Sequence, residues 1–335
     1  MSIKYKIKTS LIHFLKRLAK TAPIFRPLLK LITLKSYNFE TRGVAAGILA
    51  FESKKGNANN SSLRRNIHRI EKGLITTPMK PIFANDYIIK TVNDLKHELE
   101  YGEDSETLEW AYSILTLYFN QVEKTANVTT AQNIFSSLND NKNHSITLLK
   151  ANERKKANVT FEDLLALNKR RRSIRYYTSE KVNRKTIEDV LKLATQAPSA
   201  CNRQSFSFQI YDDKQEVSNV AKHLWGATTF ANNINCLIFI IGDLSGFEKE
   251  RDRHTIYIDS GLVAMNILLA LETVDLSSCI INCPEIPDQE LGLKRAMKLN
   301  DFERPVLCMS IGHAAPEAKF PSSRKRNINN LIKYN

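Results

Sequence analysis

Three separated segments of the chain carry polar side chains that could bind a phosphorylated or planar ligand. The first, residues 171–175, reads Arg-Arg-Ser-Ile-Arg. In an extended segment alternate residues face the same way, so Arg171, Ser173 and Arg175 would converge on one target. Two guanidiniums and a hydroxyl suit a phosphate, because charge-assisted hydrogen bonds contribute about 1.5–3 kcal/mol each. The alternative is a solvated basic loop, which is the commoner fate of a run of charges.

Two further polar segments lie C-terminal to this one. The first is the loop Pro198-Ser-Ala-Cys-Asn-Arg-Gln204, in which Ser199, Asn202 and Gln204 follow the end of a predicted helix. Asn and Gln amides can pair with a planar ring that carries both donors and acceptors, although the same residue types also serve ordinary turns. The second, residues 322–326, reads Ser-Ser-Arg-Lys-Arg and shares the bias toward anions; its alternative is a frayed basic tail.

The second half of the chain supplies the elements that must position these segments. A capping box at Thr160–Asp163 predicts the start of one helix, and Asn183 is expected to cap the next. An apolar helix is expected over residues 255–273. Short apolar runs predict strands over residues 206–211, 236–241, 278–282 and 305–311. This alternation predicts a mixed sheet flanked by helices, which is an α/β or α+β fold.

The first half of the chain is expected to be all-helical. Residues 87–101 and 107–124 have apolar side chains at helical spacing, and a polar linker is expected over residues 54–62. Residues 125–158 are Asn-rich and polar, with short helical patches. We therefore divide the chain into a helical region, 1–157, and a second domain, 158–335. No catalytic constellation is visible in the helical region.

One pattern in the helical region has chemical interest. Residues 66–74 read NIHRIEKGL, which places His68 and Glu71 three residues apart on one helix face, with basic residues around them. The pattern indicates either a polar or anion-binding site near an active centre, or an ordinary surface pair beside solvated charges.

The net charge of +14 is concentrated at the N-terminus. Residues 1–55 hold 12 Lys and Arg against 2 Asp and Glu, and a basic amphipathic helix is expected over residues 3–20. Such an arm predicts either peripheral membrane contact through residues 1–35, or a helix docked on its own domain with a solvated basic face. Nucleic-acid binding is not expected, because no zinc-finger or RNP-like motif accompanies the arm.

Several common architectures are excluded by the sequence. It contains no G-x-G and no Walker A motif, which removes the usual Rossmann and P-loop nucleotide sites. The odd number of cysteines, 5, fits a reducing cytoplasm better than a disulfide framework. No metal site is expected, because Cys279-x3-Cys283 lacks a second pair of ligands. No secretory signal and no apolar stretch of bilayer-spanning length is evident, so a cytoplasmic location is expected.

Taken together, the motifs resemble the FMN-dependent nitroreductase family. The segment RRSIRYYTSEKV, followed from residue 197 by APSACNRQ, is similar to the family's R-R-S-x-R and A-P-S-x-x-N-x-Q motifs. The similarity continues through residues 259–270, residues 276–280 and the closing segment 311–324. It covers about residues 160–335, and the first half resembles the N-terminal helical extension of a long subgroup that carries H-R-[LI]-E-K-G-L.

The resemblance implies an α+β fold and an obligate homodimer that holds two FMN molecules at its interface. Carried over by position, the residues implied to bind FMN are Arg171, Arg172, Ser173, Arg175, Pro198, Ser199, Asn202, Gln204, Ser278, Cys279, Ile280 and Arg324. The arginine segment would meet the phosphate, the ribityl chain and the pyrimidine edge, and Arg324 would return to the phosphate. The 198–204 loop would line the flavin from the partner chain, and residues 278–280 would pass near its reactive edge.

The resemblance also implies the reaction. NAD(P)H would give a hydride to the flavin and leave, and a small-molecule electron acceptor would then take the electrons in a ping-pong mechanism. No side chain is implied to act as an acid or base. One departure is Asp275-Leu276-Ser277, which replaces a family G-L-G and lacks the freedom of glycine to adopt positive φ. The alternative function is a module of the same fold with little turnover, which recruits partners or an acidic membrane surface through its basic helical N-terminus.

Overall fold

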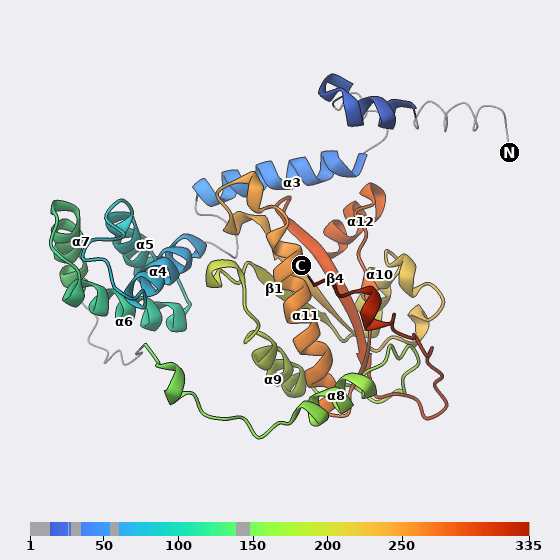
Figure 1. The fold of residues 1–335 in the computed structure, drawn as a ribbon. Helices are drawn as coiled ribbons and strands as arrows, with labels where there is room; N and C mark the ends of the chain where they lie inside the picture. The colour runs from blue at the N-terminus through green and yellow to red at the C-terminus, as the bar shows by residue number, and fades with distance from the viewer. Residues whose placement is uncertain (1–13, 26, 28–34, 54–59, 139–147, 335) are drawn as a thin grey trace.

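The chain forms two units that lie side by side, a bundle of helices and a sheet with helices on both faces (Figure 1). The computed structural model describes residues 14–25, 27, 35–53, 60–138 and 148–334. We call residues 60–138 the helical unit and residues 161–315 the sheet unit. The sheet unit begins with α8 (Phe161–Arg170), and the Thr160 side chain accepts a hydrogen bond from the Asp163 backbone N–H, which confirms the predicted capping box.

The sheet has four strands in the order β1-β2-β4-β3, and every neighbouring pair is antiparallel. The strands are β1 (Phe206–Tyr211), β2 (Cys236–Asp243), β3 (Ser277–Asn282) and β4 (Glu303–Gly312). A single bridge from Ser173 to Ser278 adds a parallel neighbour to β3. The four strands predicted from the apolar runs are confirmed, and the parallel bridge gives the sheet its mixed character.

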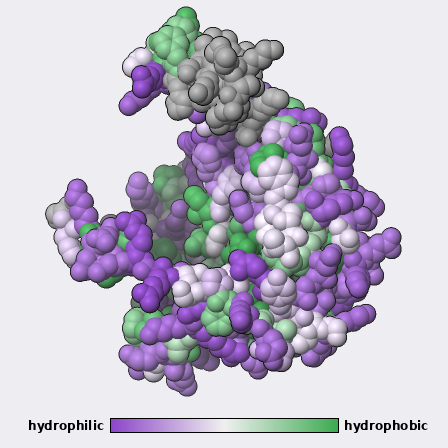
Figure 2. Space-filling view, turned by 90° about the vertical axis from the view of Figure 1, so that its right-hand side faces the viewer, coloured by the Kyte–Doolittle hydropathy of each residue, from purple (hydrophilic) through white to green (hydrophobic). Residues whose placement is uncertain are grey.

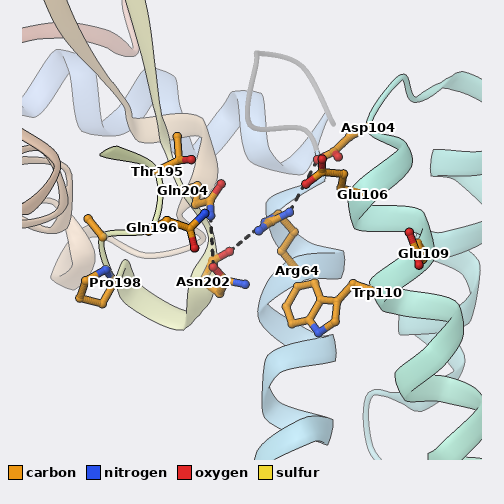
Figure 3. A pocket seen from close by; sticks show the side chains of 11 residues that line it. Arg64, Asp104, Glu106, Glu109, Trp110, Thr195, Gln196, Pro198, Asn202 and Gln204 are labelled. Atoms are coloured by element: carbon orange, nitrogen blue, oxygen red, sulfur yellow. Dashed lines mark hydrogen bonds and ion pairs between the residues drawn. The ribbon is translucent and has the colours of Figure 1, made fainter. Parts of the chain in front are cut away.

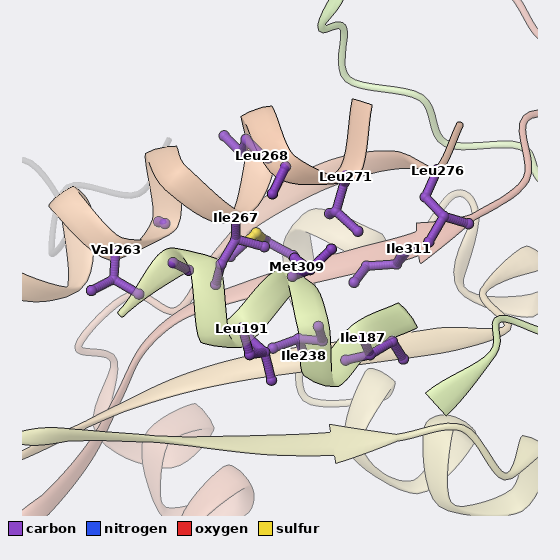
Figure 4. Close-up of a cluster of buried hydrophobic side chains, with 14 of the residues drawn as sticks. Ile187, Leu191, Ile238, Val263, Ile267, Leu268, Leu271, Leu276, Met309 and Ile311 are labelled. Carbon is purple, nitrogen blue, oxygen red and sulfur yellow. The ribbon is translucent and has the colours of Figure 1, made fainter. Parts of the chain in front are cut away.

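Helices cover both faces of the sheet, and its inner strand β2 is therefore buried along its whole length. Ile238 and Ile240 point to one face, where α9 (Arg184–Ala194) and α11 (Thr255–Thr273) pack (Figure 4). Phe239 and its neighbours at alternate positions point to the other face, which α10 (Lys214–Ala221) and α12 (Pro287–Met297) cover. This alternation is the two-residue period of a strand, and burial on both faces explains the continuous apolar run.

Helix α11 is the core helix of the sheet unit. Together with the preceding turn, over Glu250–Thr273, it is long and apolar enough by length and composition to cross a membrane. Half of its most apolar window is buried inside the fold, however. Val263, Ile267 and Leu271 lie in the cluster against the sheet (Figure 4), so packing within the protein accounts for the apolar character of the inner face of this helix.

The helical unit encloses a separate hydrophobic core. Its helices are α4 (Ser61–Leu74), α5 (Ile88–Tyr101), α6 (Ser105–Gln121) and α7 (Ala126–Ser137). The described first half is helical as predicted, although α7 is longer than the short patches expected there. The predicted linker is wrong at its end, because Ser61 and Ser62 are buried at the start of α4 and Ser62 Oγ donates to Asp94 Oδ2 over 2.7 Å.

The helix that precedes the helical unit packs against the sheet unit. α3 (Lys35–Glu52) lies along the turn Leu244–Gly246, which follows β2 (Figure 1). A Cβ on Gly47 would lie 2.7 Å from the carbonyl oxygen of Leu244, so only glycine permits this approach. The described part of the basic arm, residues 14–21, is helical; the remainder of the predicted helix 3–20 lies outside the described residues.

The visible surface of the protein is mostly hydrophilic (Figure 2), and most of its thiols are buried. The face in Figure 2 is mostly hydrophilic, with hydrophobic residues in separate patches, as expected of a folded domain. All five thiols are free and four are buried. Burial raises the pKa of Cys236 and of Cys283 to about 12, so both stay protonated and unreactive near neutral pH.

The core of the helical unit predicts the effect of truncating one α4 side chain. Ile67 is fully buried, whereas Ile75, just beyond the same helix, is 59% exposed. Ile67→Ala should lower the free energy of unfolding by about 2–5 kcal/mol, because it leaves a cavity. Ile75→Ala should change it by less than about 0.5 kcal/mol. Chemical denaturation of both variants measures the difference, and equal effects would contradict the described packing.

Candidate functional site

The arginine segment runs along the outer edge of β3. Ile174 N donates to the Ser278 carbonyl oxygen over 3.0 Å, next to the Ser173–Ser278 bridge. Ile174 is buried, while the predicted ligands on either side of it are half-buried. The segment is therefore extended and anchored by one apolar side chain, and its polar side chains stay within reach of solvent or a ligand.

The charges of this segment reach the start of β3. Burial raises the pKa of the Cys279 thiol, and the guanidiniums of Arg175 and Arg171 lower it in part. The convergence of Arg171, Ser173 and Arg175 on one target stays a prediction. Arg172 bonds back to the Arg171 carbonyl oxygen over 2.8 Å.

The start of β3 presents a polar group that lacks a partner. Ser278 is buried, and its Oγ makes no hydrogen bond within the described part of the chain. An unsatisfied buried hydroxyl costs about 1–3 kcal/mol, so a ligand atom at this position would be favourable. Ile280, two residues on, is exposed on the strand, whereas the Cys279 thiol lies in the hydrophobic cluster. The structure thus brings together the arginine segment and residues 278–280.

The turn before β3 keeps a left-handed residue although both family glycines are absent. Asp275 has φ 56°, and its carboxylate accepts from Arg170 over 2.7 Å. Asp is among the few non-glycine residues that tolerate this conformation. The loss of glycine at Asp275 therefore does not remove the positive φ, and Ser277 lies in β3 itself.

The second predicted segment, the 198–204 loop, is a compact and strained turn. Cys201, Asn202 and Gln204 have φ of 53°, 51° and 52°, a region that Asn tolerates but that Cys and Gln occupy rarely and only where their surroundings enforce it. Ser199 Oγ accepts from Gln204 N over 3.1 Å, and Gln204 Nε2 donates to Asn202 Oδ1 over 3.3 Å. The predicted polar residues of this loop therefore contact one another.

Asp259 of α11 anchors this loop from below. Both of its carboxylate oxygens lie 3.2 Å from Ala200 N, which donates to them. Burial raises the pKa of Asp259, and the hydrogen bond from Ala200 and the nearby Arg203 lower it in part. The segment 259–270, singled out in the sequence by resemblance alone, therefore has a direct structural role at the candidate site.

The loop forms one wall of a cavity of about 600 Å³ between the two units (Figure 3). Pro198, Asn202 and Gln204 line it from the sheet unit. The opposite wall comes from the helical unit and consists of Arg64, Asp104, Glu106, Glu109 and Trp110. These helical residues were not predicted from the sequence, because the pattern of a charged helix does not show which side chain will face a loop far along the chain.

The predicted His68–Glu71 pair contacts Trp110, one of the residues that line the cavity. His68 Nδ1 is 3.5 Å from Glu71 Oε2, and Trp110 Nε1 donates to Glu71 Oε1 over 3.4 Å. The predicted pair on one helix face is present, and Glu71 also supports an aromatic ring that lines the cavity.

The two groups of predicted residues lie at diagonally opposite corners of the sheet. The 198–204 loop leads into the start of β1, which pairs with the end of β2. Ser278 is at the start of β3, which pairs with the end of β4. Because the end of β2 pairs with the start of β4, the groups are at opposite ends as well as opposite edges. Three inter-strand spacings alone separate the edges by about 14 Å, so one chain does not unite the two groups.

Arg324, the third part of the predicted site, is exposed. It belongs to an exposed, irregular segment that follows β4 and continues to the C-terminus. Its role as a phosphate ligand stays a prediction.

The family model for nitroreductases matches residues 169–235 and 226–313 of the chain. The matched range begins just before the arginine segment and ends just after β4, so it contains the 198–204 loop and Ser278. Residues 169–313 therefore belong to the nitroreductase family, and the resemblance seen in the sequence is confirmed. No curated protein matches the chain significantly.

Two solved structures are similar to about half of this chain. An FMN-dependent nitroreductase from Clostridium difficile R20291 is 23% identical over 51% of this chain and 99% of its own, with a TM-score of 0.44. A nitroreductase family protein from Streptococcus pneumoniae TIGR4 is 22% identical over 51% of this chain and 100% of its own, with a TM-score of 0.45.

The anchoring of the loop by Asp259 can be tested by substitution. Asp259→Ala leaves the Ala200 N–H without its acceptor and should lower the free energy of unfolding by about 1–3 kcal/mol. Asp259→Asn keeps one acceptor oxygen and removes a charge that burial disfavours, so it should retain most of the stability. Chemical denaturation of both variants provides the comparison. If the Ala variant is as stable as the Asn variant, the hydrogen bond does not anchor the loop.

Proposed function

We propose that the protein is an FMN-dependent oxidoreductase that transfers a hydride from NAD(P)H, through the flavin, to a small-molecule acceptor in a ping-pong mechanism. The observation that carries the proposal is the arginine segment of a nitroreductase-family domain, which lies beside an unpartnered buried hydroxyl on β3.

The residues present fit the phosphate and the polar edge of FMN. Arg171, Arg172 and Arg175 offer permanently charged donors that suit a phosphate. The Ser278 hydroxyl would gain the partner that it lacks in the described chain. These features support binding of the phosphorylated chain of the cofactor along the edge of β3, with residues 278–280 next to its reactive ring.

Bound FMN would supply the redox chemistry, because it can accept a hydride from NAD(P)H and later release two electrons to the acceptor. The residues of the chain bind and orient the reactants. The half-buried guanidiniums hold the phosphate, and the amides of Asn202 and Gln204 match a ring with donors and acceptors. No side chain of the chain is assigned as an acid or base.

A homodimer would complete this site. The arginine segment and the 198–204 loop are at opposite corners of one sheet. The 198–204 loop of a second copy is therefore the simplest source of the amides that would line a flavin bound at the arginine segment. An apolar stripe on the outer face of α11 supports this view: Ile258, Leu262 and Met265 are 62%, 43% and 38% exposed. They recur at intervals of four and three residues, as on one helix face. Exposed stripes of this kind mark interfaces between subunits.

Membrane contact through residues 1–35, a cytoplasmic location and the role of the protein as a binding module with little turnover stay predictions. Lys16, Arg17 and Lys20 are exposed on the described helix of the basic arm, which suits an acidic surface. The intact arginine segment favours the enzyme over the module without turnover.

The proposed cofactor gives the protein a visible signature. The purified protein should carry the absorption bands of FMN, and anaerobic NADH or NADPH should bleach them. Arg171→Ala combined with Arg175→Ala should weaken FMN binding at least about tenfold for each charge-assisted bond lost. Arg295→Ala, which removes an exposed arginine at the end of α12, is the matched control. A colourless protein that ignores added FMN would refute the proposal.

The proposed interface predicts the effect of a charge on α11. Leu262→Glu places a carboxylate in the apolar stripe and should convert the dimer to a monomer that binds FMN poorly. Leu49→Glu on α3, a leucine that is also exposed, should leave the dimer intact. Light scattering coupled to size-exclusion chromatography measures both. A monomeric parent protein, or a dimeric Leu262→Glu variant, would show that α11 is not the interface.

A further inference from the structure

The helical unit is docked directly on the strained loop of the candidate site. Arg64 of α4 donates from Nε to the carbonyl oxygen of Asn202 over 2.8 Å (Figure 3). Three residues earlier on the same helix, Ser61 Oγ is 3.5 Å from Ser205 Oγ in a buried contact. The first turns of α4 therefore meet the loop where its chain enters β1.

Arg64 is fixed on every side. Its side chain is only 11% exposed. Its guanidinium also donates to Thr107 Oγ1, lies 3.6 Å from the Asp104 carboxylate, and stacks 5.3 Å above the Trp110 ring. A rigid planar cation with several donors suits such a junction, because it can satisfy a carbonyl, a hydroxyl and a carboxylate at once.

The ring beneath Arg64 is itself held in place. Trp110 Nε1 donates to Glu71 Oε1, and His68 Nδ1 lies 3.5 Å from Oε2 of the same carboxylate. Glu71 thus supports the indole, the indole supports the guanidinium, and the guanidinium holds the loop. A chain of direct contacts joins the core of the helical unit to Asn202.

The residue that Arg64 holds lies between two residues whose backbone conformation needs an external constraint, because Asn tolerates positive φ but Cys and Gln rarely adopt it. Asn202 sits at φ 51°, between Cys201 and Gln204, which also have positive φ. Such conformations persist where the surrounding structure determines them, and they gather at functional sites. Arg64 binds the backbone of Asn202, and the side-chain amides of Asn202 and Gln204, which are hydrogen-bonded to each other, line the cavity.

We propose that Arg64 is a positioning residue for the flavin: it fixes the Asn202 backbone, and through it the helical unit sets the geometry of the amides that face the ring. The inference rests on the proposed function for its ligand. Its structural part, the fixing of the loop by Arg64, does not depend on FMN.

The test compares three full-length variants. Arg64→Met removes the cation but keeps a long apolar side chain, and Arg64→Lys restores one donor. Arg69→Met is the matched control, because Arg69 is on the same helix but stacks 3.8 Å over Tyr87. Arg64→Met should raise the Kd for FMN about tenfold and shift the visible circular dichroism of the bound flavin. Arg64→Lys should recover part of both changes, and Arg69→Met should stay within about twofold of the parent.

Hydrogen–deuterium exchange without FMN separates this inference from the proposed function. The amides of residues 199–205 should exchange at least about tenfold faster in Arg64→Met, while those of β2 stay protected. This result would support the inference even if the parent protein bound no FMN. Unchanged exchange of the loop in Arg64→Met, or an equal effect of Arg69→Met, would overturn it.

A second variant protects the test against misfolding of Arg64→Met. Trp110→Phe keeps an aromatic ring under the guanidinium but removes the N–H that binds Glu71. It should change loop exchange in the same direction as Arg64→Met, by a smaller factor. Faster exchange in Arg64→Met together with no change in Trp110→Phe would assign the loop contact to Arg64 but exclude the support from Glu71, which overturns that part of the inference.

Discussion

The burial of β2 on both faces is the constraint on which the remaining architecture depends. A strand that is apolar from Cys236 to Ile241 must be covered twice, by α9 and α11 on one side and by α10 and α12 on the other. With β2 and β4 inside the sheet, β1 and β3 become its edges. The 198–204 loop, which leads into β1, and the arginine segment, which lies beside the start of β3, are thereby placed at two separate corners, where they are open to ligands and to other chains.

Local patterns in the sequence were sufficient for much of this fold. The strands stood out as short apolar runs, and α11 as an apolar helix with the same ends as in the structure. The helix caps at Thr160 and Asn183 could be predicted from the sequence, because a cap involves only one side chain and the first turn of the helix that follows it. Where polar residues are buried by a distant partner the patterns failed, as at Ser61 and Ser62, whose composition is that of a linker.

Only part of the candidate site could be predicted from the sequence, for the same reason. The arginine segment and the 198–204 loop carry motifs that occupy a few consecutive residues. The contact between Arg64 and Asn202 joins positions that are 138 residues apart, and neither an arginine nor an asparagine in the sequence indicates which distant residue it will contact. Asp275 is a different case: the sequence shows the loss of glycine, but only the backbone shows that the left-handed turn persists, supported by Arg170.

The packing of α3 on the turn after β2 has a consequence for how the helical unit is attached. The chain packs α3 against the sheet unit, then builds α4–α7, and enters the sheet unit itself at α8. The helical unit is thus an insertion tethered at both ends, not a terminal appendage. Two tethers keep the local concentration of its docking surface high, so even weak contacts stay closed. Even where those contacts are lost, the helical unit stays joined to the rest of the chain at both of its ends.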